Sequence, residues 1–268
     1  MAGISTSRAA QLYWLAAGLL LVWIVILYLE QPYTGRAHAL VVTSVGIVGT
    51  AVGGMFTTAV LIRRHSPFAA MAAAFTGTVA FIMSWFHLLT GTAVSITAAL
   101  IGTAIILAPV VVISGWVARR ISAERAAGPP LPGWVPWIYL AAGAALLAVI
   151  VRMAVITPSE HDAEHLRLVW TGLDVFEFVA LAATAVHLQR RSPGLAVAAT
   201  VAGALLLSDA WFNIAASTGA ARFSAIAMGL VEVPLAAVSF TIAGQETRSW
   251  GRRDRLGASR VPDDRGVR

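Results

Sequence analysis

Long apolar runs separated by short polar segments make up most of the chain between residues 9 and 244. A membrane-spanning helix needs roughly 20 mainly apolar residues, and each run is about that long. Backbone groups cannot stay unpaired in hydrocarbon, and the alternation typical of a membrane barrel is missing, so we expect helices throughout. The first run is longer than the roughly 7–15 residues of a signal-peptide core and is expected to be a retained helix. Eight runs qualify, at about 9–30, 39–62, 68–90, 93–118, 134–156, 168–188, 195–217 and 224–244.

The positions of the arginines predict the orientation of these helices. Most arginines fall in segments on one side of the predicted bundle, and the opposite loops hold only Arg36, Arg167 and Arg222. By the positive-inside rule, the basic side is cytoplasmic and both termini lie there. The sequence therefore predicts a multi-pass protein of the cell membrane, with the lipid bilayer as its partner. The segments on the basic side contain Arg8, Arg63, Arg64, Arg119, Arg120, Arg125, Arg190 and Arg191.

The second half of the chain repeats the first at an offset of 126 residues. Residues 64–86 align with residues 190–212 without a gap, and nine of the twenty-three positions are identical. The identities include the Ser-Pro and Trp-Phe dipeptides of both segments, and a one-residue slip then aligns Pro109 with Pro234. Because each unit has four helices, both copies would share one orientation, related by an axis along the membrane normal.

This repeat divides the chain into four parts. Residues 1–123 form the first four-helix repeat, residues 124–133 a Pro/Gly linker, and residues 134–244 the second repeat. Residues 245–268 form a basic cytoplasmic tail that we expect to be disordered or to lie at the lipid surface. The predicted fold class is all-α: a polytopic membrane protein of eight transmembrane helices, built as two parallel four-helix repeats.

Comparison of the two repeats isolates four acidic residues in the apolar runs of the second. Each acid costs on the order of 2.5–3.5 kcal/mol at the centre of a membrane helix. Their counterparts in the first repeat are apolar, so the first copy forms without them and the fold does not require them. The aligned pairs are Asp174 with Val48, Glu177 with Ala51, Asp209 with Met83 and, after the slip, Glu232 with Leu107.

At about 1.5 Å per residue, the four acids lie at one level in the outer half of the membrane, together with an arginine and an asparagine. Two interpretations are open. In one, Arg152 forms a buried bridge with one or two acids and holds the bundle together. In the other, all six residues line an outward-facing polar cavity for a small cationic ligand or a proton. The six residues are Arg152, Asp174, Glu177, Asp209, Asn213 and Glu232.

Few other residues suggest chemistry. His161 and His165 lie four residues apart and on a helix they could bind zinc or copper, but a solvated loop is the favoured interpretation of this segment. The chain contains no cysteine and no lysine, which excludes thiolate sites and Schiff-base cofactors. Its net charge of +6 comes from arginines at the ends of apolar runs, so it indicates topology and no nucleic-acid partner. No nucleophile arrangement emerges, and no cofactor is indicated.

Three motifs of the second half resemble a group of uncharacterised actinobacterial polytopic membrane proteins. The motifs are W-x-G-x-D at residues 170–174, Arg-Arg with Ser-Pro at residues 190–193, and D-A-W-F at residues 209–212. The group continues the last motif with a second Asp, but this chain has Asn213, which argues against a carboxylate pair at positions 209 and 213. The resemblance implies the polytopic fold, marks Asp174, Asp209 and Trp211 as special positions, and implies no particular activity.

Three functions are compatible with these patterns. The favoured one is a binding or transport site for a small molecule or cation, linked to protonation, in the second repeat. The alternative is an accessory or scaffold protein whose buried polar cluster only holds the bundle. The least favoured is an intramembrane enzyme that uses the acids together with His161 and His165 around a metal. The sequence names no substrate and no oligomeric state.

Overall fold

The computed structural model describes residues 6–30, 36–90, 100–125, 128, 130–156, 161–217, 219 and 221–258, and its regular structure there is entirely helical. This confirms the all-α prediction. The helices are α1 (Thr6–Glu30), α2 (Arg36–Arg63), α3 (Ala69–Thr90), η1 (Thr103–Leu107), α5 (Ala108–Ala123), α6 (Val135–Ile156), α7 (His161–Arg190), α8 (Leu195–Ala216) and α9 (Ala221–Ala258).

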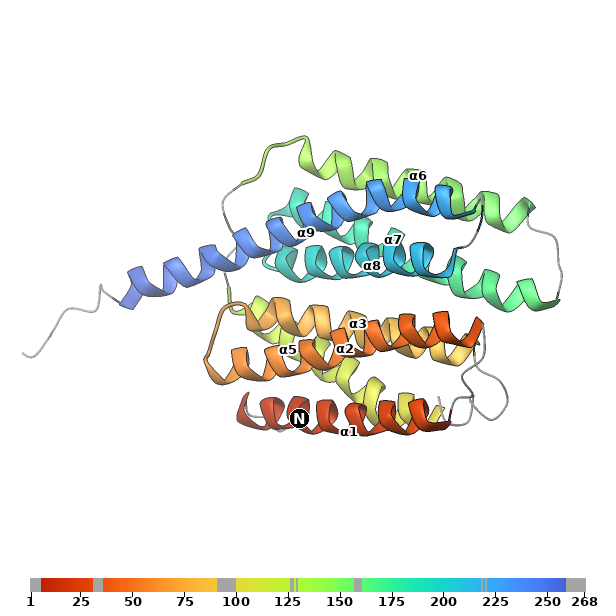
Figure 1. Ribbon diagram of the computed structural model, residues 1–268. Helices are drawn as coiled ribbons and strands as arrows, with labels where there is room; N and C mark the ends of the chain where they lie inside the picture. The colour runs from red at the N-terminus through yellow and green to blue at the C-terminus, as the bar shows by residue number, and fades with distance from the viewer. Residues whose placement is uncertain are drawn as a thin grey trace, which may run out of the picture.

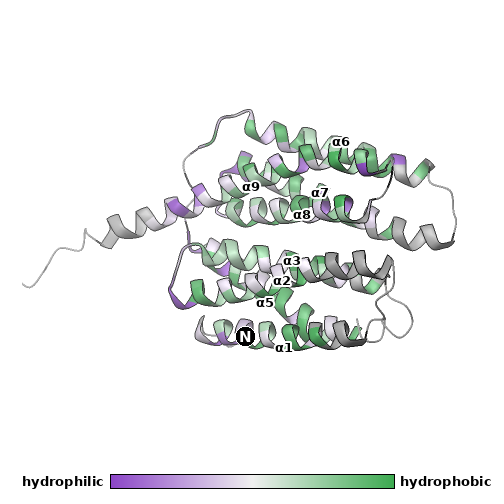
Figure 2. Ribbon diagram, viewed as in Figure 1, coloured by the Kyte–Doolittle hydropathy of each residue, from purple (hydrophilic) through white to green (hydrophobic). Residues whose placement is uncertain are grey.

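The helices run up and down in two groups that lie against each other, α1 to α5 in one and α6 to α9 in the other (Figure 1). Helix α1 begins and α9 ends at the same end of the bundle. Among the described residues, seven helical segments, with mean hydropathies of 1.4 to 2.3, are long and apolar enough to cross a membrane. Apolar residues cover these lengths, and hydrophilic ones gather at the end where α9 projects (Figure 2). The architecture is therefore that of a multi-pass membrane protein.

The two central helices are α3 and α8, which pack against each other and join the two groups. The membrane-crossing segment of α3 is 61% buried and that of α8 is 72% buried, whereas that of the peripheral helix α6 is 17% buried. Each group also has its own apolar core. Helix α3 contributes to the core of the first group and α8 to that of the second, and both helices also line the boundary between the groups. Residues on α8 are consequently the most deeply enclosed in the second group.

Two features recur in both groups at an offset of 125 or 126 residues. The Tyr13 hydroxyl and Ser114 Oγ lie 2.7 Å apart, and the Tyr139 hydroxyl and Ser239 Oγ lie 2.9 Å apart. Both pairs are buried, and each ties the first helix of its group to the last. The turns before α3 and α8 also match, since His65 and Arg191, 126 residues apart, both have positive φ, of 49° and 47°.

The boundary between the groups contains a reciprocal pair of tryptophan–glycine contacts. The Trp85 indole lies over Gly172 of the second group, and the Trp211 indole lies over Gly46 of the first. In both cases the absence of a side chain on the glycine lets the indole approach the backbone. Phe176 holds Trp85 in place through an edge-to-face contact, with ring centroids 5.3 Å apart.

Three elements differ from their sequence-based expectations. The fourth run contains a π-helical turn, η1, directly before the helix that carries Pro109, and its residues 93–99 lie outside the described part. Proline cannot donate the backbone hydrogen bond of a regular helix, and a π turn is one way to accommodate the gap. Helix α9 continues past residue 244 to Ala258, so the basic tail is helical over its first part. Helix α7 begins at His161, where a solvated loop was the favoured expectation.

The tryptophan–glycine contacts predict that a methyl group at position 172 is destabilising. A Cβ on Gly172 would overlap the Trp85 ring, which Phe176 prevents from moving aside. We expect Gly172→Ala to lower the free energy of unfolding by about 1–3 kcal/mol, the usual range for overpacking. Thermal unfolding of the purified protein in detergent measures this change.

The matched control is Gly49→Ala, because a Cβ on Gly49 meets no atom within 4 Å. This variant is expected to leave the unfolding midpoint unchanged or slightly raised, since alanine favours the helix. Equal midpoints for Gly172→Ala and the wild type would contradict the packing that we describe.

Candidate functional site

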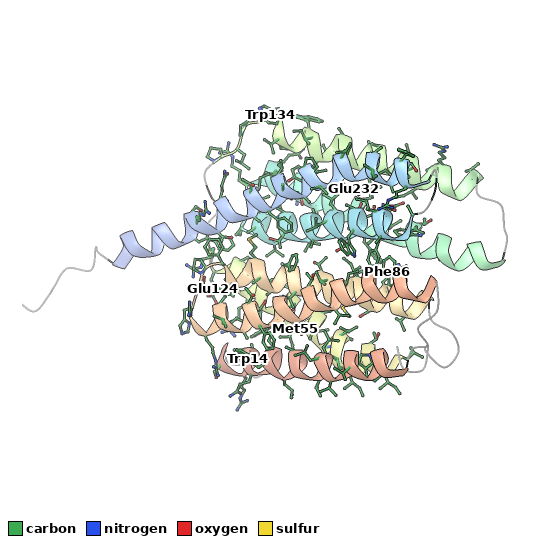
Figure 3. All side chains as sticks on the ribbon, in the orientation of Figure 1. Trp14, Met55, Phe86, Glu124, Trp134 and Glu232 are labelled. Atoms are coloured by element: carbon green, nitrogen blue, oxygen red, sulfur yellow. The ribbon has the colours of Figure 1, made fainter. Side chains whose placement is uncertain are left out.

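Three helices of the second group bring the four intramembrane acids together. Asp174 and Glu177 lie on one face of α7 because residues three apart are neighbours on a helix. Asp209 lies on the central helix α8, and Glu232 lies on α9, where Figure 3 labels it within the second group. All four side chains are buried, with exposed fractions of 5%, 1%, 1% and 9% in chain order. The acids therefore face the protein interior and not lipid.

The carboxyl groups lie close enough to act as a unit, which we call the acid cluster (Asp174, Glu177, Asp209 and Glu232). One carboxylate oxygen from each of Asp174, Glu177 and Asp209 lies within 4.8 Å of the other two. The Glu232 carboxyl lies within hydrogen-bonding reach of Asp209. Asn213 is the neutral neighbour, and its Nδ2 donates to Asp209 Oδ2 at 2.8 Å. Five of the six predicted site residues are thus brought together.

The acid cluster lacks donors for several of its buried oxygens. Within the described part of the chain, Glu177 Oε1, Asp209 Oδ1 and Glu232 Oε2 have no hydrogen-bond donor, and solvent does not reach them. Two carboxylates can hydrogen-bond to each other only with a proton between them, so the Asp209–Glu232 pair is satisfied only when it is protonated. A buried polar atom without a partner costs about 1–3 kcal/mol, and more if it is charged. In a dry environment the cluster therefore favours a proton or another cation.

The positions that align with the acid cluster are buried and apolar in the first group. Val48, Ala51, Met83 and Leu107 have exposed fractions of 5%, 0%, 3% and 5%, and all four belong to the apolar core of that group. The same four places are thus enclosed in both groups, but one group fills them with hydrocarbon and thioether, and the other with carboxyl groups. Burial at these places is a property of the helix arrangement, and the acidity is particular to the second group.

Arg152 lies apart from the acid cluster. Its side chain is exposed on the outer face of α6 and pairs with none of the four acids in the described part of the chain. It borders a shallow groove of about 570 Å³ whose other lining residues, from Ala144 to Val155, all belong to α6. The buried ion pair between Arg152 and the acids, which the structural interpretation requires, is therefore not formed in this structure. Arg152 does not balance the negative charge of the acid cluster.

The histidine pair falls outside the described side chains. Both His161 and His165 lie in the first two turns of α7, at helical spacing, but their side chains are not among those described. The metal site that they could form therefore stays a prediction. His87, which aligns with Asn213, is likewise outside the described side chains.

An aromatic cluster next to the acids was not predicted from the sequence as a unit. The Phe86 and Phe212 rings stack with centroids 3.8 Å apart and planes at 9°, and Trp170 packs edge-on against both. Figure 3 labels Phe86 where the two groups meet. Phe212 lies one turn after Asp209, and Trp170 lies one turn before Asp174, so the rings adjoin the acid cluster toward the ends of α3 and α8. The recurrence of the Trp-Phe dipeptide in both halves was the available signal.

If the acid cluster is a site and not a structural bridge, removing one acid should stabilise the empty protein. Glu177→Met keeps the side-chain length and removes a buried oxygen that has no donor. We expect the free energy of unfolding to rise by about 1–3 kcal/mol, the cost of an unsatisfied buried group. Unfolding in detergent at low ionic strength and with a chelator present measures the change.

Glu124→Gln is the control, because Glu124 is exposed and forms a surface ion pair with Arg120 at 3.8 Å. Surface substitutions of this kind usually change stability by within about 0.5 kcal/mol. A loss of stability in Glu177→Met would show that the acid cluster holds the bundle together.

Comparisons with known proteins identify no relative. No family model matches the chain, and neither a curated protein nor a solved structure is similar to it. The resemblance to actinobacterial membrane proteins stays a prediction, and the interpretation of the site depends on its geometry.

Proposed function

We propose that the protein is a membrane transporter of small cations whose acid cluster binds the cation in exchange for protons. The observation that carries this proposal is the convergence of three buried carboxylates within 4.8 Å, with oxygens that lack donors and with Arg152 outside the cluster. Intramembrane ionisable groups mark ion pathways and proton relays because their burial is otherwise unfavourable. A cation bound at this position would balance the charge that the protein itself leaves uncompensated.

The comparison between the two groups supports a role in binding over a role in folding. The first group packs Val48, Ala51, Met83 and Leu107 at the equivalent places, where they contribute to its core. Replacement of apolar core residues by carboxyl groups lowers stability unless the groups find partners. The acid cluster is thus a feature that costs stability, and such features persist at functional sites because the function requires them.

We also propose that the two groups arose by duplication of a four-helix unit and have the same orientation in the membrane. Support comes from the paired Tyr–Ser contacts, the paired positive-φ turns and the reciprocal tryptophan–glycine contacts. The arginine-rich end, where α1 begins, is assigned to the cytoplasm of the cell by the positive-inside rule. The acid cluster then lies toward the external surface of the cell membrane.

A scaffold function is the second candidate, and one observation favours it. The contact of Asp209 with Glu232 ties α8 to α9, and the Asn213–Asp209 hydrogen bond orients Asp209 within α8. These contacts use only part of the cluster, however, and leave Glu177 Oε1 without a donor. A structural network would be expected to satisfy each of its buried members.

The orientation can be tested directly because the chain contains no cysteine that would react in the background. Glu124→Cys places a thiol after α5, and Ser217→Cys places one after α8, at opposite ends of the bundle. An impermeant maleimide added to intact cells should label the thiol at position 217 and should label position 124 only after permeabilisation. The reverse pattern would overturn the proposed topology.

The transport proposal predicts that Asp209 is required for coupled ion movement. In proteoliposomes that contain a pH-sensitive dye, an inward cation gradient should drive protons outward through the wild-type protein. Asp209→Asn keeps the side-chain shape and a polar contact for Asn213 but removes the exchangeable charge. Its rate should fall to that of empty liposomes, with insertion and thermal unfolding preserved.

Glu124→Gln serves again as the matched control and should transport at the wild-type rate, because this carboxylate is exposed and outside the acid cluster. Equal proton fluxes in the wild type and Asp209→Asn would contradict the proposal. Failure of Asp209→Asn to accumulate, together with loss of stability in Glu177→Met, would favour the scaffold function.

A further inference from the structure

We infer that the ion bound by the acid cluster is a single hard divalent cation of the Mg²⁺, Mn²⁺ and Ca²⁺ class, held by Asp174, Glu177 and Asp209. This inference rests on the proposed function and names its substrate class. Four features of the site support it: the spacing of the oxygens, the types of ligand, the enclosure of the site and the charge of the three ligands.

The spacing of the carboxylate oxygens fits one metal ion. The three oxygens lie within 4.8 Å of one another. Three points so arranged lie within about 2.8 Å of a common centre, whereas Mg²⁺ and Ca²⁺ bind oxygen at about 2.0–2.6 Å. Side-chain rotations that move each oxygen inward by a few tenths of an ångström bring all three into contact with one ion. No movement of the helix backbones is needed.

The ligand types favour hard cations. Carboxylates and amide oxygens suit Mg²⁺, Mn²⁺ and Ca²⁺, whereas zinc and copper sites use thiolate or imidazole ligands. The chain has no cysteine, and among the described side chains no histidine joins the cluster. Glu177 is the independent indication of a ligand, because its side chain is 99% buried and its Oε1 has no donor. Glu177 is also one of the three residues whose carboxylate oxygens lie within 4.8 Å of one another.

The enclosure of the site argues for a bare ion over an organic cation. None of the four acids is more than 9% exposed, so a ligand among them is surrounded by protein. Two cavities in the described part of the chain lie away from the acids: the groove beside Arg152 on α6, and a space of about 80 Å³ between α1, η1 and α5. An amine with an organic body would need such a space beside the carboxylates. A dehydrated ion needs only the distance between the oxygens.

The charge balance favours a divalent ion. The three ligand carboxylates together carry three negative charges when they bind an ion. A divalent ion then leaves one negative charge uncompensated and a monovalent ion leaves two, and uncompensated charge is costly in a buried site. Under the proposed exchange, the protons that these carboxyl groups carry leave as the ion enters.

The experiment measures Mn²⁺ binding to the full-length protein in nanodiscs after removal of metals with a chelator. The electron paramagnetic resonance signal of free Mn²⁺ should fall until one equivalent is bound per chain, and Mg²⁺ or Ca²⁺ should restore it. In weakly buffered solution, at least one proton should be released for each ion bound. Glu177→Gln should weaken Mn²⁺ binding by at least the roughly 10–100-fold that loss of an outer-shell partner causes.

Glu124→Gln should bind Mn²⁺ as the wild type does, and Glu177→Asp, which keeps the charge, provides a second variant if Glu177→Gln does not fold. The inference is overturned if folded wild-type protein binds no Mn²⁺ at about 1 mM, near the weak limit of natural Ca²⁺ sites. Binding that Zn²⁺ displaces but Mg²⁺ and Ca²⁺ do not would also overturn it.

The outcomes distinguish this inference from the proposed function. Proton flux that depends on Asp209, without Mn²⁺ binding, would leave a proton-linked transporter standing and show that the substrate class is wrong. Mn²⁺ binding without any flux would show that the site is correct and that transport is wrong. Absence of both would overturn both proposals.

Discussion

The packing of α3 against α8 is the contact on which the rest of the structure depends. It unites two helix groups that each have a separate core, and it encloses α8 more completely than any other described span. Asp209 is buried because α8 is central, and α7 and α9 place Asp174, Glu177 and Glu232 around it. The burial and convergence of the four acids thus follow from helix position, and the tryptophan–glycine contacts at the same boundary fix how closely the groups approach.

Much of this arrangement was predictable because membrane helices leave strong signals in a sequence. Length and apolarity predicted the helices, and alignment of the two halves singled out the four acids before any contact was known. Their convergence follows from two simple facts. The four acids lie at similar depths along neighbouring helices. The aligned positions in the other half are buried, so the helix faces that carry the acids are expected to point inward as well.

The direction of Arg152 was not predictable from the sequence. Helix α6 is apolar on all sides, so its sequence does not show which face meets α7 and which meets lipid. An arginine near the end of such a helix can keep its charged head at the interface while its stem lies along apolar surface. The aromatic stack of Phe86 on Phe212 also escaped prediction, because the recurrence of a dipeptide does not show that the two copies meet.

The π turn η1 has a consequence for the alignment of the two halves. Trp85 and Trp211 are 126 residues apart, whereas Ser114 and Ser239 are 125 apart, so one residue is gained in the first half between them. A π turn holds more residues than an α turn, and η1 lies within this interval. An insertion taken up over one turn leaves the following helix in its original rotational phase. Ser114 therefore meets Tyr13 as Ser239 meets Tyr139, and the extra residue does not shift the rest of α5 relative to α1.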